Sequence, residues 1–252
     1  MGKDLYLYNS LAGQELQIWA LFTLFAATNH DDKPKHMKVI DFNQSNSVLN
    51  QFVAEIRDVN IQGDSLRFRR NIERIGEVMA YEMSKALHYT CRSVQTPLGI
   101  AEVNVPDSPL VLATILRAGL PFHHGFLNYF DRAENAFVSA YRKYIDEEHF
   151  DVNIEYIASP DITGKTLMLV DPMLATGSSM ELSYRAMLTR GVPAEVHVAC
   201  VIATRQAVDY IKQTLPAEKT TIWCAAVDPD LNEHCYIVPG LGDAGDLCFG
   251  EK

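Results

Sequence analysis

The sequence predicts an α/β fold, with an open and mostly parallel twisted sheet, helices on both faces, and a small additional hood or arm. Three observations support this prediction. The chain has 252 residues, 48% apolar and 21% charged, enough for one large α/β domain or two small ones. The run from Pro109 to Leu116 is almost continuously apolar, as expected of a strand that is buried on both faces. After it, strand-like and helix-like segments alternate.

The expected elements begin with a helix at Ser65, whose side chain can cap it and which precedes apolar residues with a period near 3.6. The segment Thr96 to Ile100 contains proline and glycine and predicts a hairpin or arm. Strands are expected at residues 109–116, 136–141, 166–170, 195–203 and 220–227. Helices are expected at 178–190, ending at Gly191, and at 204–214.

Residues 1–36 are expected to form an N-terminal extension to a domain that spans residues 37–252. The apolar stretch of the extension, Ile18 to Ala27, is too short to span a bilayer. No positively charged segment precedes it, as one would in a signal peptide. Two interpretations remain open. The extension is a helix that packs on the domain or on a partner subunit, or it results from an upstream start codon, with Met37 as the working start.

The charge and the cysteines exclude several classes of function. The 22 Lys and Arg residues against 32 Asp and Glu residues give a net charge of −10, which opposes binding to nucleic acid or to an anionic membrane. The five cysteines are widely spaced and form no C-x-x-C pair, so they predict neither a disulfide framework nor a zinc site. We therefore expect a protein of the reducing cytoplasm with no nucleic-acid or membrane partner.

The segment from Asp171 to Ser179 predicts a site for a phosphate group. It runs from an expected strand into an expected helix, where unpaired backbone N–H groups and the helix dipole attract anions. Asp171 can accept hydrogen bonds from sugar hydroxyls. In the alternative interpretation, the hydroxyl residues only cap the helix. The residues concerned are Asp171, Pro172, Met173, Leu174, Ala175, Thr176, Gly177, Ser178 and Ser179.

Two arginines and a glycine-rich tail complete the candidate site. Arg117 and Arg142 each follow an expected strand, and ligands of open parallel sheets bind beyond the carboxyl ends of the strands. Two such guanidinium groups could hold a polyanion with paired hydrogen bonds, although each could equally form a surface salt bridge. The tail from Tyr236 to Asp246 has three glycines and two aspartates. This composition predicts little regular structure and favours recognition of a flat polar ring by the backbone.

These segments together resemble the uracil phosphoribosyltransferase family of type I phosphoribosyltransferases. The resemblance extends from about Met37 to the C-terminus. The matching strings are ILRAGL (115–120), YR (141–142), VDPMLATG (170–177) with two serines after it, LNEH (231–234), YIVPGLGDAGD (236–246) and FG (249–250).

The resemblance implies an enzyme of pyrimidine salvage that transfers a pentosyl group. Uracil and 5-phosphoribosyl-1-pyrophosphate (PRPP) would form UMP and diphosphate, with Mg²⁺ held mainly by PRPP and by no assigned protein ligand. Residues 171–179 would bind PRPP, with Asp171 at the ribose hydroxyls. Arg117 and Arg142 would contact the pyrophosphate, and Asp243 would face PRPP or its metal. Arg117, Arg142 and Asp243 form the implied catalytic set.

The same resemblance assigns the uracil site to the tail, at Ile237, Gly242, Asp243 and Ala244. It also implies a homodimer or a higher homo-oligomer, with GTP as a candidate effector. One departure from the family concerns Ser178, which stands where a second glycine is usual; its Cβ would crowd the phosphate if the residue needed a positive φ.

Such departures keep an alternative open, a diverged non-catalytic or regulatory protein of the same fold that binds UMP or PRPP. A purine phosphoribosyltransferase is disfavoured, because those loops carry two adjacent acids where this chain has Asp171 and Pro172.

Overall fold

The computed structural model describes residues 36–144 and 150–251. The chain from Met37 onward forms one compact unit. The expected N-terminal extension, residues 1–36, lies outside the described residues except for His36, so both interpretations of it remain predictions. Within the described ranges, no helix has the length and apolar character needed to cross a membrane.

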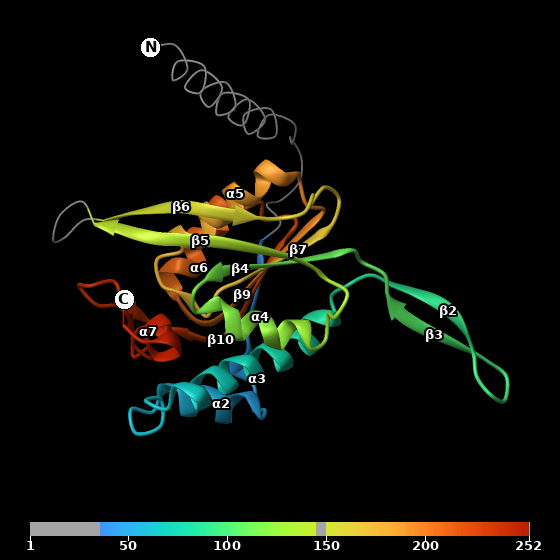
Figure 1. Ribbon diagram of the computed structural model, residues 1–252, viewed down its shortest axis with the longest axis horizontal. Coiled ribbons are helices and arrows are strands. Elements are labelled where there is room, and N and C mark those ends of the chain that lie inside the picture. Colours follow the sequence, from blue (N-terminus) through green and yellow to red (C-terminus); the bar gives the residue numbers. More distant parts are fainter. Residues whose placement is uncertain (1–35, 145–149, 252) are drawn as a thin grey trace, which may run out of the picture. The chain divides into compact units, whose positions relative to one another are not determined.

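The core of the unit is one twisted sheet with seven strands along its path (Figure 1). All neighbouring pairs are parallel except the last, in which β6 is antiparallel to β5. The open, mostly parallel sheet predicted from the sequence is therefore confirmed. In spatial order the strands are β1 (Lys38–Asp41), β10 (Thr220–Asp228), β9 (Glu195–Thr204), β7 (Thr166–Val170), β4 (Leu110–Leu116), β5 (Glu134–Tyr144) and β6 (Phe150–Ala158).

Helices cover both faces of this sheet, as predicted. Successive side chains of each strand point to opposite faces, and apolar side chains on both faces pack against helices. Leu112 packs in one apolar cluster with α2, α3, α4 and α7, whereas Val111 and Ala113 pack in the other with α5 and α6. The helices are α2 (Leu49–Arg57), α3 (Ser65–Ser84), α4 (Gly119–Leu127), α5 (Ser178–Met187), α6 (Arg205–Thr214) and α7 (Ala244–Phe249); two 3₁₀ turns, η1 (Phe42–Gln44) and η2 (Leu188–Arg190), follow β1 and α5.

The structure corrects two expectations about helices. The cap of α3 is Asp64 rather than Ser65: its Oδ1 accepts hydrogen bonds from the backbone N–H groups of Leu66 and Arg67. The second correction concerns α2 and α4, neither of which was predicted from the sequence. Gly125 of α4 allows close packing on α3, since a Cβ there would lie 2.1 Å from the carbonyl oxygen of Glu73.

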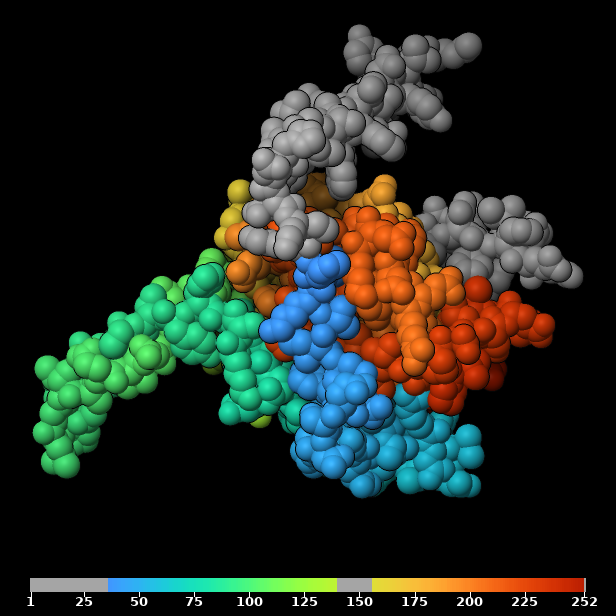
Figure 2. Space-filling view, turned by 180° about the vertical axis from the view of Figure 1, so that it is seen from behind, coloured from blue at the N-terminus to red at the C-terminus, as the bar shows by residue number. Residues whose placement is uncertain are grey.

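A two-stranded arm leaves the unit between α3 and β4, which confirms the predicted hairpin. It consists of β2 (Tyr89–Gln95) and β3 (Ile100–Pro106), paired in antiparallel register. The arm extends well away from the sheet and helices, as Figure 2 shows in green. Every residue of β2 is exposed, so the arm contributes nothing to the core.

The tail is more regular than its composition predicts. The short strands β11 (Asp230–Leu231) and β12 (Ile237–Val238) pair in antiparallel register. The helix α7 then begins at Ala244, because the Oδ1 atom of Asp243 accepts the N–H groups of Gly245 and Asp246 at its first turn. The expectation of little regular structure for residues 236–246 was therefore wrong at residues 237–238 and 244–246.

One further short strand belongs to the predicted phosphate loop. It is β8 (Met173–Leu174), which pairs in parallel with the end of β9. This pairing ties the middle of the loop to the sheet.

Candidate functional site

A cavity of about 420 Å³ opens at the carboxyl ends of β4 and β7. Three separate segments line it: the end of β4 with the residues that follow, the loop after β7, and the tail from Cys235 to Asp246. Three of the four groups of residues singled out in the sequence therefore face one cavity. The fourth group, Tyr141 and Arg142, is not among the residues that line the cavity.

The loop after β7 contributes Asp171, Met173, Ala175 and Ser179 to the cavity lining. The other members of the predicted phosphate segment lie beside it. Pro172 is buried and its carbonyl accepts the N–H groups of Val201 and Ile202 of β9, and Leu174 is buried in the core. Thr176, Gly177 and Ser178 form the turn into α5 and are not among the lining residues.

This turn resolves the question raised by Ser178. The positive φ that the turn needs, 88°, occurs at Gly177, while Ser178 is the first residue of α5. A Cβ at Gly177 would lie 2.7 Å from the ring of Tyr210, so glycine is required for both its backbone and its space. The hydroxyls of Ser178 and Thr176 lie 2.8 Å apart. Ser178 is therefore accommodated without backbone strain.

Asp171 has the most perturbed carboxyl group in the cavity lining. Its pKa is raised to about 7, mainly by burial; the hydrogen bond from the Met173 N–H lowers it, and the negative charge of Asp243 raises it. That hydrogen bond measures 3.1 Å to Oδ1. Two carboxyl groups from distant segments thus share the cavity and repel each other, and Asp171 titrates near neutral pH.

Arg117 lines the same cavity at the end of β4, after a cis peptide bond with Leu116. Its Nη2 lies 3.3 Å from Oδ1 of Asp246 and 3.4 Å from the carbonyl oxygen of Gly250. Its Nε is buried and has no hydrogen-bond partner. The guanidinium thus joins the β4 end to α7, and the Arg117 side chain is 37% exposed.

The placement of Arg142 differs from the expectation. The strand extends to Tyr144, so Arg142 lies within β5, opposite Val152 of β6, rather than just beyond the strand end. The sequence did not reveal β6, whose pairing prolongs β5. The side chain of Arg142 lies outside what the structure describes. Its predicted contact with pyrophosphate stays a prediction.

All four residues predicted for uracil line the cavity: Ile237, Gly242, Asp243 and Ala244. Gly242 has a φ of 92°, which only glycine adopts easily. The carboxylate of Asp243 caps α7 through Oδ1 alone, with bonds of 2.7 and 3.1 Å. The tail therefore presents backbone groups and one carboxylate to the cavity.

Sequence reasoning missed several lining residues. Asp246 could have been found, since it is the second aspartate of the tail string and pairs with Arg117. Cys235 and Tyr236 also line the cavity. Cys235 has a φ of 59°, and no pattern in the sequence marks it, because it lies between two matching strings.

The chemistry of the lining fits a magnesium ion bound together with a polyanion. In the two described ranges no three His, Cys, Asp or Glu side chains gather as a metal site. Asp171 and Asp243 still offer carboxylate oxygens, the ligand type that Mg²⁺ prefers, and their mutual repulsion would decrease beside a cation.

Comparisons with known proteins show which family the chain is similar to. Residues 43–251 match the family model of uracil phosphoribosyltransferase. A uracil phosphoribosyltransferase of Porphyromonas gingivalis is 67% identical over 216 residues, 86% of this chain and 100% of the relative. One of Methanothermobacter thermautotrophicus is 38% identical over 222 residues, 87% of this chain and 98% of the relative.

Among solved structures, the AQ2163 protein from Aquifex aeolicus matches with a TM-score of 0.75 and 29% identity. The match covers 84% of this chain and 98% of that protein. Since the family model and both relatives cover most of the chain, this protein belongs to the uracil phosphoribosyltransferase family.

Proposed function

We propose that the protein transfers the phosphoribosyl group of PRPP to uracil and forms UMP and diphosphate. The observation that carries this proposal is the shared cavity. Arg117, the loop that begins at Asp171 and the glycine-rich tail line one volume of about 420 Å³. Both substrates can therefore meet there, with the anionic donor between the loop and Arg117 and the base against the tail.

The chemistry needs charge stabilisation more than a nucleophile. As the bond between ribose and diphosphate breaks, positive charge develops on the sugar and negative charge on the leaving group. Arg117 would stabilise the leaving diphosphate through its guanidinium, since the side chain lines the cavity and is 37% exposed. Arg142 of β5 is proposed as the second cation for the same group.

The loop after β7 would bind the ribose 5-phosphate. The N-terminus of α5 follows Gly177, so its free backbone N–H groups and dipole attract the phosphate. Asp171 would accept hydrogen bonds from the ribose hydroxyls, and this role requires its ionised form. Asp171 and Asp243 would also lie next to Mg²⁺, which on binding with PRPP supplies neutralisation of the phosphate charge.

Backbone groups of Ile237, Gly242 and Ala244 would recognise the edge of uracil, with Asp243 facing the donor side. Fixed donors and acceptors discriminate bases because a wrong base leaves them unpaired, at a cost of about 1–3 kcal/mol per group. Cytosine, with an amine where uracil has a carbonyl, would be rejected in this way.

The expected homodimer or higher homo-oligomer is also part of the proposal. The exposed arm supports it, because Leu98 at its tip is 99% exposed and Ile100 is 70% exposed. Light scattering after size exclusion would measure the mass. A cytoplasmic location, supported by the cysteine pattern, and GTP as effector remain predictions.

One assay separates the enzyme from the non-catalytic alternative. The protein is incubated with PRPP, Mg²⁺ and either uracil, cytosine or hypoxanthine, and diphosphate release is followed. We expect release with uracil alone. Absence of release with all three bases, together with retained UMP binding, would support the regulatory alternative.

A further inference from the structure

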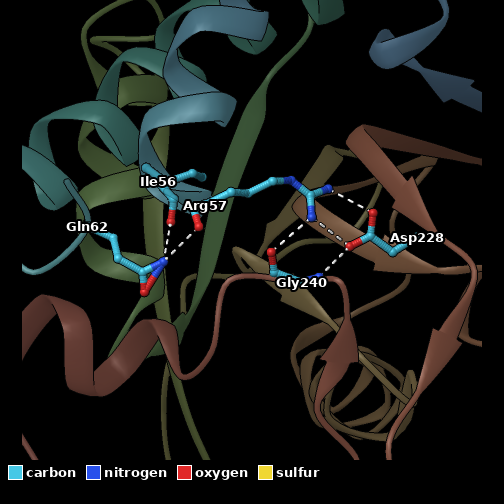
Figure 3. A network of polar contacts seen from close by, with 5 residues as sticks. All are labelled: Ile56, Arg57, Gln62, Asp228 and Gly240. Atoms are coloured by element: carbon cyan, nitrogen blue, oxygen red, sulfur yellow. Dashed lines mark hydrogen bonds and ion pairs between the residues drawn. The ribbon is translucent and has the colours of Figure 1, made fainter. Parts of the chain in front are cut away.

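A partly buried ion pair outside the cavity holds the tail at Gly240. Arg57 is the last residue of α2, and Asp228 is the last residue of β10. The guanidinium binds the carboxylate with two bonds of 2.8 Å, and the exposed fractions of the two side chains are 22% and 8% (Figure 3). Neither residue lines the cavity.

The pair binds both backbone polar groups of Gly240. The Gly240 N–H donates to Oδ2 of Asp228 at 2.8 Å, and Nη1 of Arg57 donates to the Gly240 carbonyl at 2.9 Å. The N–H and the carbonyl of Gly240 are thus held by two segments that are distant in sequence. A displacement of Gly240, or a rotation of either of its peptide groups, would break a hydrogen bond to a charged side chain.

Gly240 lies between the two parts of the tail that face the cavity. Ile237 lines the cavity on one side of it, and Gly242 does so on the other. The turn is tight: Gly240 has a φ of 56°, and a Cβ on it would lie 2.1 Å from the Ile237 carbonyl oxygen. The position of Gly240 therefore sets the separation of the two lining segments.

A further contact fixes the end of α2 itself. The side-chain amide of Gln62 donates to the carbonyls of Ile56 and Arg57, at 3.2 and 3.1 Å (Figure 3). These carbonyls have no partner within the helix, so Gln62 holds the backbone from which Arg57 extends.

We propose that Arg57 and Asp228 are positioning residues that set the uracil affinity by holding the Ile237–Gly242 turn. This inference rests on the proposed function, since it assigns the base site to the tail. The donor site lies mainly on Arg117 and on the loop after β7, which the ion pair does not contact. Asp243, the tail residue on the donor side, is held by its own bonds to Gly245 and Asp246. The pair should therefore affect uracil and PRPP unequally.

The first test compares the KM values of the two substrates. In Arg57→Met we expect the KM for uracil to rise about tenfold while the KM for PRPP stays within about twofold, because Ile237 and Gly242 move with the turn, whereas Asp243 on the donor side keeps its own bonds to the N–H groups of Gly245 and Asp246. Arg57→Lys keeps the charge but loses the planar fork, so its uracil KM should fall between those of the wild type and Arg57→Met.

Arg67→Met is the matched control. Arg67 also pairs with a buried carboxylate of α2, that of Glu55, at 2.9 Å. We expect both KM values to stay at the wild-type level in this variant. An unchanged uracil KM in Arg57→Met, an equal rise of both KM values, or an equal effect in Arg67→Met would overturn the proposal.

A second measurement does not depend on turnover. In Arg57→Met, amide hydrogen exchange over residues 237–243 should become about tenfold faster, while exchange over 171–179 stays unchanged. If the wild type turns over no base, the proposed function fails and this measurement alone decides the positioning role. Unchanged exchange over 237–243 would then refute it.

The unpaired Asp228 in Arg57→Met could prevent folding. The double variant Arg57→Met/Asp228→Asn removes both charges and keeps an acceptor for the Gly240 N–H. We expect it to fold and still to show the raised uracil KM, because the bond to the Gly240 carbonyl is lost. A folded double variant with the wild-type uracil KM would contradict the proposal.

Discussion

The two main walls of the cavity are built in opposite ways. The loop at 171–179 is held by contacts within itself and with the neighbouring strand β9: Asp171 accepts the Met173 N–H, and the Pro172 carbonyl accepts two N–H groups of β9. The tail is held from far along the chain. Its Gly240 is bound by Arg57, and its Asp246 is bound by Arg117.

The two substrate sites are therefore sensitive to changes in different parts of the chain. The donor wall, residues 171–179, should be damaged mainly by changes inside the loop or at Arg117, which faces it. The base wall, residues 235–246, should also be damaged by changes at Arg57, which touches no substrate. Four predictions test this contrast, in decreasing order of effect.

The largest effect is expected for Arg117→Ala, the residue that lies between the two walls. Loss of the guanidinium should lower kcat/KM for PRPP about hundredfold, since it removes a cation from the leaving diphosphate. Steady-state kinetics with varied PRPP measure this. Arg92→Ala, on the exposed arm, is the control. Unchanged PRPP kinetics in Arg117→Ala would remove this residue from the donor site.

A change inside the donor wall comes next. Gly177→Ala should cost about 2–3 kcal/mol of unfolding free energy, because it adds a clash with Tyr210 to the strain of a positive φ, and it should weaken PRPP binding. Gly164→Ala is matched in φ, at 70°, but has open space around the new Cβ, so it should cost only about 1 kcal/mol.

Denaturant unfolding and PRPP kinetics of the two glycine variants would show this difference. Equal losses of stability in both would mean that the space beside Tyr210 does not matter. A normal KM for PRPP in folded Gly177→Ala would mean that the loop tolerates displacement. It would contradict the expectation that changes inside the loop damage the donor site.

The third prediction concerns pH. Since the pKa of Asp171 is raised to about 7, its carboxylate forms as the pH rises through 7. The ionised form accepts the ribose hydroxyls, so kcat/KM for PRPP should rise about tenfold between pH 6 and 8. In Asp171→Asn this titration should disappear. A flat profile in the wild type would show that Asp171 is not required in its ionised form.

The smallest effect is expected for Asp246→Asn. Its ion pair with Arg117 is 37% exposed on both sides, and such pairs contribute about 0–1 kcal/mol. Unfolding free energy should change by less than about 1 kcal/mol, measured by denaturant titration. The KM for PRPP should not rise, because the substitution frees Arg117 for the donor. A large rise would instead assign Asp246 to donor binding.

The donor wall could be predicted from the sequence because its signal is local. A buried strand, a loop of small and hydroxyl residues and a helix start follow one another within the segment from Thr166 to Ser179. The open parallel sheet was predictable for a similar reason, since each buried strand is a contiguous apolar run. Only the exact position of the positive φ, at Gly177, required coordinates.

The base wall could not be derived in this way. Its residues were found through the family resemblance, while the contact between Arg57 and Gly240 joins positions 183 residues apart, which no local pattern encodes. Likewise α4 was missed because Gly119, Pro121 and Gly125 obscure its helical pattern, although close contacts with Thr114 and with α3 explain the two glycines. The position of Arg142 within β5 could not be predicted either, because β5 is prolonged by its pairing with β6, a strand that the sequence did not reveal.

The proximity of Asp171 and Asp243 gives donor binding an acid–base character. If Asp171 has to be ionised to hold PRPP and Mg²⁺, near pH 7 about half a proton would be released from its carboxyl group to the buffer for each molecule bound. Calorimetric heats should then vary with the ionisation enthalpy of the buffer. Occupancy of the donor site would be coupled to the local acidity of the surrounding solution.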